Sequence, residues 1–191
     1  MDIRSPDPLK QVPFWYKWEM LFWLWGAFFL NQADRALYGV VLPQLKHELH
    51  LEPDQEGLIG SVFFWTLACV VPLAGYASDL LSRRKIIGGS LLFWSVATTC
   101  TGLARNWVHL MCFRSLATGG GEAFYAPAAN ALISDFHHKT RSLALSIHQT
   151  SLYFGVIASG FLGGLVADQW GWRATFWVFG GIGILWAGLT W

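Results

Sequence analysis

The stretch Asn31-Gln32-Ala33-Asp34-Arg35 places a carboxylate beside a guanidinium inside an apolar tract that runs from about residue 20 to 45. An ionised side chain at mid-bilayer depth costs roughly 2.5 to 3.5 kcal/mol on insertion scales, so such residues usually face a bundle interior or a watery cavity. Asp34 and Arg35 are therefore candidate functional residues.

The composition is typical of a membrane protein. Hydrophobic residues make up 54% of the chain and charged residues only 13%, whereas soluble domains carry about 25% charged residues. Apolar tracts recur at residues 20–45, 57–77, 86–104, 107–133, 143–167 and 174–191. At 1.5 Å per residue, each tract spans or nearly spans a hydrocarbon core of about 30 Å. The sequence predicts an all-α polytopic membrane domain of six transmembrane helices over residues 20–191.

Charge placement predicts the orientation of these helices. Residues 1–19 are broken by three prolines and show no cleavage site behind an apolar core, so we expect a cytoplasmic tail. The tail and the even-numbered connections carry eight cations: Arg4, Lys10, Lys17, Arg83, Arg84, Lys85, Lys139 and Arg141. The odd-numbered connections carry Lys46, Arg105 and Arg173. The positive-inside rule therefore places both termini in the cytoplasm, with the helices in the inner or plasma membrane.

Other chemistry has little support in the sequence. The three cysteines, Cys69, Cys100 and Cys112, lie within predicted helices and are interpreted as packing residues. His148, in the fifth predicted helix, is expected to make a structural hydrogen bond. The motifs His-Glu-x-x-His and Gly-x-Ser-x-Gly are absent from the sequence. We expect neither an enzyme nor a metal or cofactor, and the net charge of +1 indicates no nucleic-acid partner.

Two segments of the sequence resemble each other. Gly75 precedes Asp79 by four residues at the end of the second helix, and Gly164 precedes Asp168 in the same way at the end of the fifth. The two copies are 89 residues apart, and the same 89-residue shift carries the Asp34-Arg35 pair to the two residues directly after Glu122, which lies in the fourth helix. The six helices are therefore interpreted as two three-helix copies. An odd number of helices per copy makes the repeat inverted, as in transporters.

At these residues the chain resembles the N-terminal six-helix half of the major facilitator superfamily. The loop signature Gly-x-x-x-Asp-(Arg/Lys)-x-Gly-x-(Arg/Lys)-(Arg/Lys) of that family corresponds to residues 75–85, with Leu80 and Ser82 as departures. The resemblance implies a state-dependent cytoplasmic gate in which the acid pairs with either arginine. The gate residues would be Gly75, Asp79, Arg83 and Arg84.

Two further segments resemble the anion:cation symporter family, which includes hexuronate and sugar-acid carriers. Residues 31–35, followed by Leu42-Pro43, are similar to its Asn-Tyr-x-Asp-Arg segment. Residues 121–127 are similar to its Gly-Glu-Ala segment, which Spinster-like lipid carriers share. The resemblance implies that Arg35 holds an anionic substrate and that Asp34 and Glu122 couple protons. The alternative is a buried ion pair that only fixes helix packing.

Helix spacing adds three polar neighbours to these charged residues. Asn31 lies four residues before Arg35, Tyr38 three after it, and Tyr125 three after Glu122, so each shares a helix face with its charged partner. These side chains are expected either to bind substrate or to form interhelical packing bonds.

Arg114 departs from the spacing of the family. It stands eight residues before Glu122, where the family places an arginine seven residues before. On an ideal helix this changes the angular offset from about 20° to about 80°. A bulge at Gly119-Gly120-Gly121 would restore the facing of Arg114, and the glycines would otherwise serve close helix packing.

The sequence therefore predicts half of a secondary transporter that imports an organic anion, such as a sugar acid, together with protons. The alternatives are a Spinster-like lipid or amphiphile exporter, a drug:proton antiporter, or a membrane fragment without transport activity. Facilitators rock two six-helix halves around a central site. We therefore expect membrane lipids as surroundings, and as partner either a missing C-terminal half or a second copy.

Overall fold

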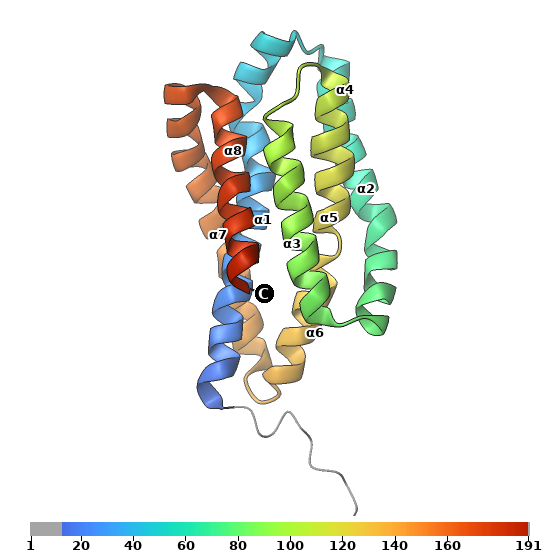
Figure 1. Ribbon diagram of the computed structural model, residues 1–191, viewed down its shortest axis with the longest axis vertical. Coiled ribbons are helices and arrows are strands. Elements are labelled where there is room, and N and C mark those ends of the chain that lie inside the picture. The colour runs from blue at the N-terminus through green and yellow to red at the C-terminus, as the bar shows by residue number, and fades with distance from the viewer. Residues whose placement is uncertain (1–12, 191) are drawn as a thin grey trace, which may run out of the picture.

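The computed structural model describes residues 13–190, and this range consists of helices and the connections between them and contains no strand. Arg4 and Lys10 of the predicted tail, and Trp191 of the last predicted helix, lie outside the described residues. The elements are α1 (Phe14–Leu49), α2 (Pro53–Leu80), α3 (Arg83–Thr101), α4 (Trp107–Leu110), the π-helix η2 (Met111–Thr118), α5 (Gly119–Glu122), α6 (Tyr125–Phe136), α7 (Arg141–Ala158), the π-helix η3 (Ser159–Gly163) and α8 (Gly164–Thr190) (Figure 1).

Within residues 13–190 these elements join into six rods. The first three rods are α1, α2 and α3, and the fourth contains α4, η2, α5 and α6 in series. The fifth contains α7, η3 and the start of α8, and the remainder of α8 forms the sixth. The chain reverses inside α8 at Gly171, whose φ of 83° suits a residue without Cβ. The predicted all-α class is confirmed, but α1 begins before the apolar tract that was expected from residue 20.

Local sequence explains where the first two helices begin and end. Pro13 precedes α1, and His50 ends it in the left-handed conformation with φ 50°. Pro53 stands at the first turn of α2, where its missing N–H leaves no helical hydrogen bond unmade. Glu52 and Gln55 form a capping box there. The connection between the two antiparallel rods is therefore short and defined.

Much of the apolar surface faces outward. Phe64, Trp65 and Leu73 of α2 are 65%, 64% and 65% exposed. By length and composition, Pro53–Leu80 and the stretch Arg141–Thr190 are apolar enough to cross a membrane. Exposed apolar surface of this extent requires lipid or another apolar helix around it.

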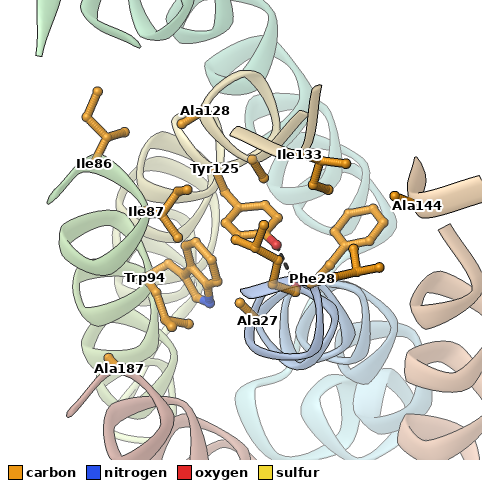
Figure 2. Packing of buried hydrophobic residues seen from close by; sticks show 14 residues of the cluster. Ala27, Phe28, Ile86, Ile87, Trp94, Tyr125, Ala128, Ile133, Ala144 and Ala187 are labelled. Carbon is orange, nitrogen blue, oxygen red and sulfur yellow. Dashed lines mark hydrogen bonds between the residues drawn. The ribbon is translucent and has the colours of Figure 1, made fainter. Parts of the chain in front are cut away.

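Two buried apolar clusters stabilise the bundle at different levels of α1. The first contains Leu24 and Phe28 of α1 with Trp94 and Tyr125 (Figure 2). The second begins at Ala33 and includes Leu37, Val41, Leu45 and Phe176. The Asn31–Arg35 segment lies at the junction of the two clusters, so the charged residues are placed in the interior of the bundle.

A close approach between α1 and α7 fixes this junction. A Cβ atom added at Gly155 would lie 2.6 Å from the Phe29 carbonyl oxygen and 3.0 Å from the Ala33 nitrogen. A larger residue at this position would separate the two backbones. Gly155 therefore holds α7 against the segment of α1 that carries the charged pair.

Polar contacts join three rods at the end of α1. Glu48 accepts a hydrogen bond from Trp172 Nε1 at 2.7 Å and pairs with Arg173. Arg173 Nη2 also donates to the Ala104 carbonyl at 3.0 Å. The hydrogen bond from Arg173 lowers the pKa of the Glu48 carboxyl below its ordinary value, and the bond from Trp172 acts in the same direction.

Candidate functional site

Four charged side chains form a network between the first and fourth rods. Arg35 Nε lies 2.6 Å from Glu122 Oε2, and Arg114 Nη1 lies 3.7 Å from Asp34 Oδ2. Arg114 Nη2 also donates to the Arg35 carbonyl at 3.4 Å. The negative charges of the two carboxylates and the positive charges of the two guanidiniums therefore balance across the interface between the rods.

Exposure differs among the four residues. Asp34, Arg114 and Glu122 are 3%, 4% and 1% exposed, whereas the Arg35 side chain is 34% exposed. Burial of a charge is unfavourable unless the charge is paired and hydrogen-bonded, which explains the pairing of the three buried groups. Arg35 is the member of the network that a ligand outside the protein can reach.

The π-helix η2 determines the position of Arg114. A π-helical turn contains one residue more than an α-helical turn, so it compensates for the eight-residue separation between Arg114 and Glu122. The Thr118 hydroxyl donates to the Phe113 carbonyl at 2.9 Å within η2. The expected widening is therefore present, but it lies directly before the glycine run, and Gly119–Glu122 is itself α-helical.

Two further residues support the network and were not identified from the sequence. The Thr98 hydroxyl of α3 donates to Asp34 Oδ2 at 2.7 Å. The Phe63 ring of α2 lies under both guanidiniums, with its centroid 4.7 Å from Arg114 Cζ and 5.7 Å from Arg35 Cζ. Neither residue carries a charge or motif, so no feature of the sequence links it to the site.

Several polar atoms around the network make no hydrogen bond within the described part of the chain. They are Asn31 Nδ2, Asp34 Oδ1, Tyr38 Oη and Glu122 Oε1, and each is buried. Buried polar groups are normally satisfied. These atoms of α1 and of Glu122 can therefore still bind protons or form hydrogen bonds to a polar ligand.

Tyr125 has the second of the two roles that the sequence left open, an interhelical packing bond. A turn at Ala123 and Phe124 separates α5 from α6, and the Tyr125 hydroxyl donates to the Leu24 carbonyl at 2.6 Å. The same oxygen lies 3.0 Å from His148 Nε2. Tyr125 therefore lies in the apolar cluster between Phe28 and Trp94 (Figure 2), where it makes an interhelical packing bond.

Among the predicted gate residues, Arg83 has a different partner from the one expected. Arg83, at the start of α3, pairs with Asp135 of α6 and not with Asp79. Asp79 is exposed near the end of α2, and a Cβ atom at Gly75 would meet no atom within 4 Å. Arg84 lines a separate cavity of about 420 Å³ beside Tyr16 and Phe136. The partner of Arg83 is thus an acid from another rod, and the alternative pairing of Asp79 with Arg84 stays a prediction.

Comparison with known proteins agrees with this architecture. The family model described as Major Facilitator Superfamily matches residues 24–191. The chain is 28% identical to "Sodium-dependent phosphate transport protein 1, chloroplastic" of Arabidopsis thaliana over 97% of its own length and 38% of the relative. It is 32% identical to "Protein spinster homolog 1" of Bos taurus over 82% of its own length and 30% of the relative.

A solved structure has the same fold. The crystal structure of a bacterial homologue of the human lysosomal transporter Spinster, inward-facing and unoccupied, superposes with a TM-score of 0.82 at 25% identity. The match covers 98% of this chain and 43% of that protein, so the chain spans less than half the length of the relatives it matches. The match over residues 24–191 shows that the chain belongs to the Major Facilitator Superfamily, a family of integral membrane transporters.

Proposed function

We propose that this chain supplies one six-helix unit of a secondary transporter that takes up an organic anion, such as a sugar acid, together with protons. It would work with a second six-helix unit, provided by a longer polypeptide or by another copy. In this proposal Arg35 binds the anionic group of the substrate, and Asp34 and Glu122 carry the coupled protons.

The observation that carries the proposal is the contact between Arg35 and Glu122. Arg35 is partly exposed while its partner Glu122 is buried, and their atoms are 2.6 Å apart. A substrate carboxylate that binds Arg35 competes with Glu122 for the same guanidinium. An arginine fork suits this exchange because it binds a carboxylate through two parallel hydrogen bonds.

Competition for Arg35 provides a route to coupling. A buried carboxylate that loses its counter-ion is disfavoured as an anion, so Glu122 gains a proton when substrate displaces it from Arg35. Asp34 keeps Arg114 and Thr98 as partners during this step. Substrate and proton therefore enter the site together, as symport requires.

A second candidate is a Spinster-like carrier of a lipid or amphiphile. The likeness to the bovine and bacterial Spinster relatives favours it. The likeness to the Arabidopsis phosphate transport protein, named for an anion, favours anion transport. The unpaired carboxylate oxygens of Asp34 and Glu122 accept hydrogen bonds, so they suit the hydroxyl groups of a sugar acid better than a hydrocarbon chain.

The decisive experiment is Glu122→Gln in the assembled two-unit transporter, reconstituted in proteoliposomes with a labelled sugar acid. Glutamine is a neutral analogue of the protonated acid. We expect accumulation driven by a pH gradient to be abolished and counterflow exchange to persist. Glu19→Gln, at an exposed position of α1, is the control.

Two outcomes would contradict the proposal. Accumulation in Glu122→Gln that still follows an imposed pH gradient would remove Glu122 from coupling. Absence of sugar-acid uptake in every variant, together with efflux of an amphiphile by the unmodified protein, would establish the Spinster-like alternative.

A further inference from the structure

An apolar groove of about 760 Å³ lies between the C-terminal half of α2 and the N-terminal half of α3, and Leu116, Gly120, Gly121 and Phe124 of the fourth rod also line it. Small-molecule sites usually have volumes of about 300 to 1,000 Å³. Leu80, Leu81, Ile86, Phe93 and Leu116 line the groove, and Ser82 and Lys85 lie at one end of it.

Two glycines keep this groove open. A Cβ atom at Gly89 of α3 would meet no atom within 4 Å, and one at Gly120 would meet only Thr66 Cγ2, at 3.9 Å. The lining residues Leu80 and Phe93 are 65% and 55% exposed, so the groove is accessible from the side of the bundle. An apolar trough of this form suits an extended hydrocarbon chain better than a compact ligand.

The polar end of the groove is cationic. The first turn of α3 contains Arg83, Arg84 and Lys85 and no acid, and the Ser82 side chain makes no capping hydrogen bond. Cations at a helix N-terminus are electrostatically unfavourable, whereas an anion there is stabilised. Arg83 is bound to Asp135, but the exposed Lys85 lines the groove directly. Charge complementarity therefore favours an occupant that combines an apolar chain with an anionic head.

We propose that this groove binds an anionic phospholipid, with one acyl chain between α2 and α3 and the phosphate beside Lys85 and Ser82. From Lys85 to Phe93 the groove follows α3 for roughly 12 Å at 1.5 Å per residue. The polar end lies on the side that the charge pattern predicts as cytoplasmic, where anionic lipids are concentrated. This site is independent of the proposed transport activity.

The first test fills the groove at Gly89. The variant Gly89→Leu adds a side chain whose Cβ would meet no atom within 4 Å, and Gly181→Leu is a matched control because the same holds for its Cβ on α8. Both substitutions replace a helical glycine, so their effects on helix propensity are equal. In native mass spectrometry of the purified chain titrated with phosphatidylglycerol, we expect Gly89→Leu alone to lose the tightest-bound lipid.

The second test removes the charge at Lys85. The variant Lys85→Ala is expected to lower the preference for phosphatidylglycerol over phosphatidylcholine about fivefold, the effect of one lysine near an anionic surface. The control is Lys139→Ala, an exposed cation in the connection between α6 and α7. An unchanged preference in Lys85→Ala, or equal loss in both variants, would overturn the assignment of the headgroup.

A protein occupant of the groove would give a different result. If a second copy or a second six-helix unit covers the groove, Gly89→Leu will change the oligomeric state in solution while lipid retention stays at the level of Gly181→Leu. That result would overturn the lipid proposal. Neither readout depends on uptake, so failure here is distinguishable from failure of the transport proposal.

Discussion

Arg114 Nη1 lies 3.7 Å from Asp34 Oδ2 in the interior of the bundle. Regular α-helical spacing would turn Arg114 away from the face of Glu122, since the two residues are eight positions apart. The π-helical segment Met111–Thr118 corrects the facing. A local change of helix type therefore completes a network whose other members come from α1 and α5.

This pairing predicts the effect of Arg114→Ala. The substitution leaves the buried Asp34 carboxylate without its guanidinium, and such a loss typically costs about 3 to 5 kcal/mol. We expect a clearly lower thermal unfolding temperature for the chain in detergent, with Arg105→Ala, at an exposed position, close to the unmodified protein. Adding Asp34→Asn should restore part of the loss. Equal unfolding temperatures for the two arginine variants would show that the contact contributes nothing to stability.

Arg35→Lys tests the anion-binding role. Lysine keeps the charge but cannot form the two parallel hydrogen bonds of the guanidinium. In the assembled transporter we expect KM for the anionic substrate to rise about tenfold, the effect of one lost charge-assisted hydrogen bond, while Arg105→Lys remains unchanged. A KM equal to that of the unmodified protein would refute the role. Equal losses for neutral and anionic substrates would instead indicate a structural arginine.

Tyr125→Phe separates packing from substrate binding. The change removes the hydrogen bond to the Leu24 carbonyl and leaves His148 Nε2 without its partner. We expect a loss of about 1 to 3 kcal/mol in unfolding free energy, with KM unchanged. Tyr153→Phe is the control because Tyr153 is 69% exposed. A raised KM at unchanged stability would place Tyr125 in the substrate site.

Glu48 predicts a pH dependence of stability. Its pKa is lowered in the folded protein, chiefly by the hydrogen bond from Arg173. Its contribution is therefore fully present above the pKa of the unfolded chain and is lost as pH falls through the folded-state pKa. We expect Glu48→Gln to lower the unfolding temperature at neutral pH, and the difference from the unmodified protein to shrink under acid conditions. Asp54→Asn is the control, and a difference independent of pH would contradict the expectation.

The orientation of the helices can be tested with reporter fusions. Because eight cations lie on one predicted side and three on the other, a reporter placed near Lys139 is expected in the cytoplasm and one near Asp54 outside. The measurement is alkaline phosphatase activity, which requires export, compared with green fluorescence, which requires the cytoplasm. Export of the reporter at Lys139 would refute the predicted arrangement.

The sequence by itself determined the class of this protein and the identity of its principal charged residues. Apolar tracts predict helices because the length of a membrane span follows from the rise per residue. Asp34, Arg35 and Glu122 were found because an ionised group in an apolar tract is unfavourable whatever its neighbours are. These features are local, so they can be read without knowing how the helices pack.

Only the tertiary structure decided which residues are partners. Arg35 pairs with Glu122 and not with adjacent Asp34, since consecutive helical residues do not face each other. Arg83 pairs with Asp135, and Thr98 supports Asp34 from another rod. Each of these contacts joins residues far apart in the chain. Their geometry depends on the packing and register of whole helices, including the π-helical turn at Arg114, and helical periodicity alone does not specify that register.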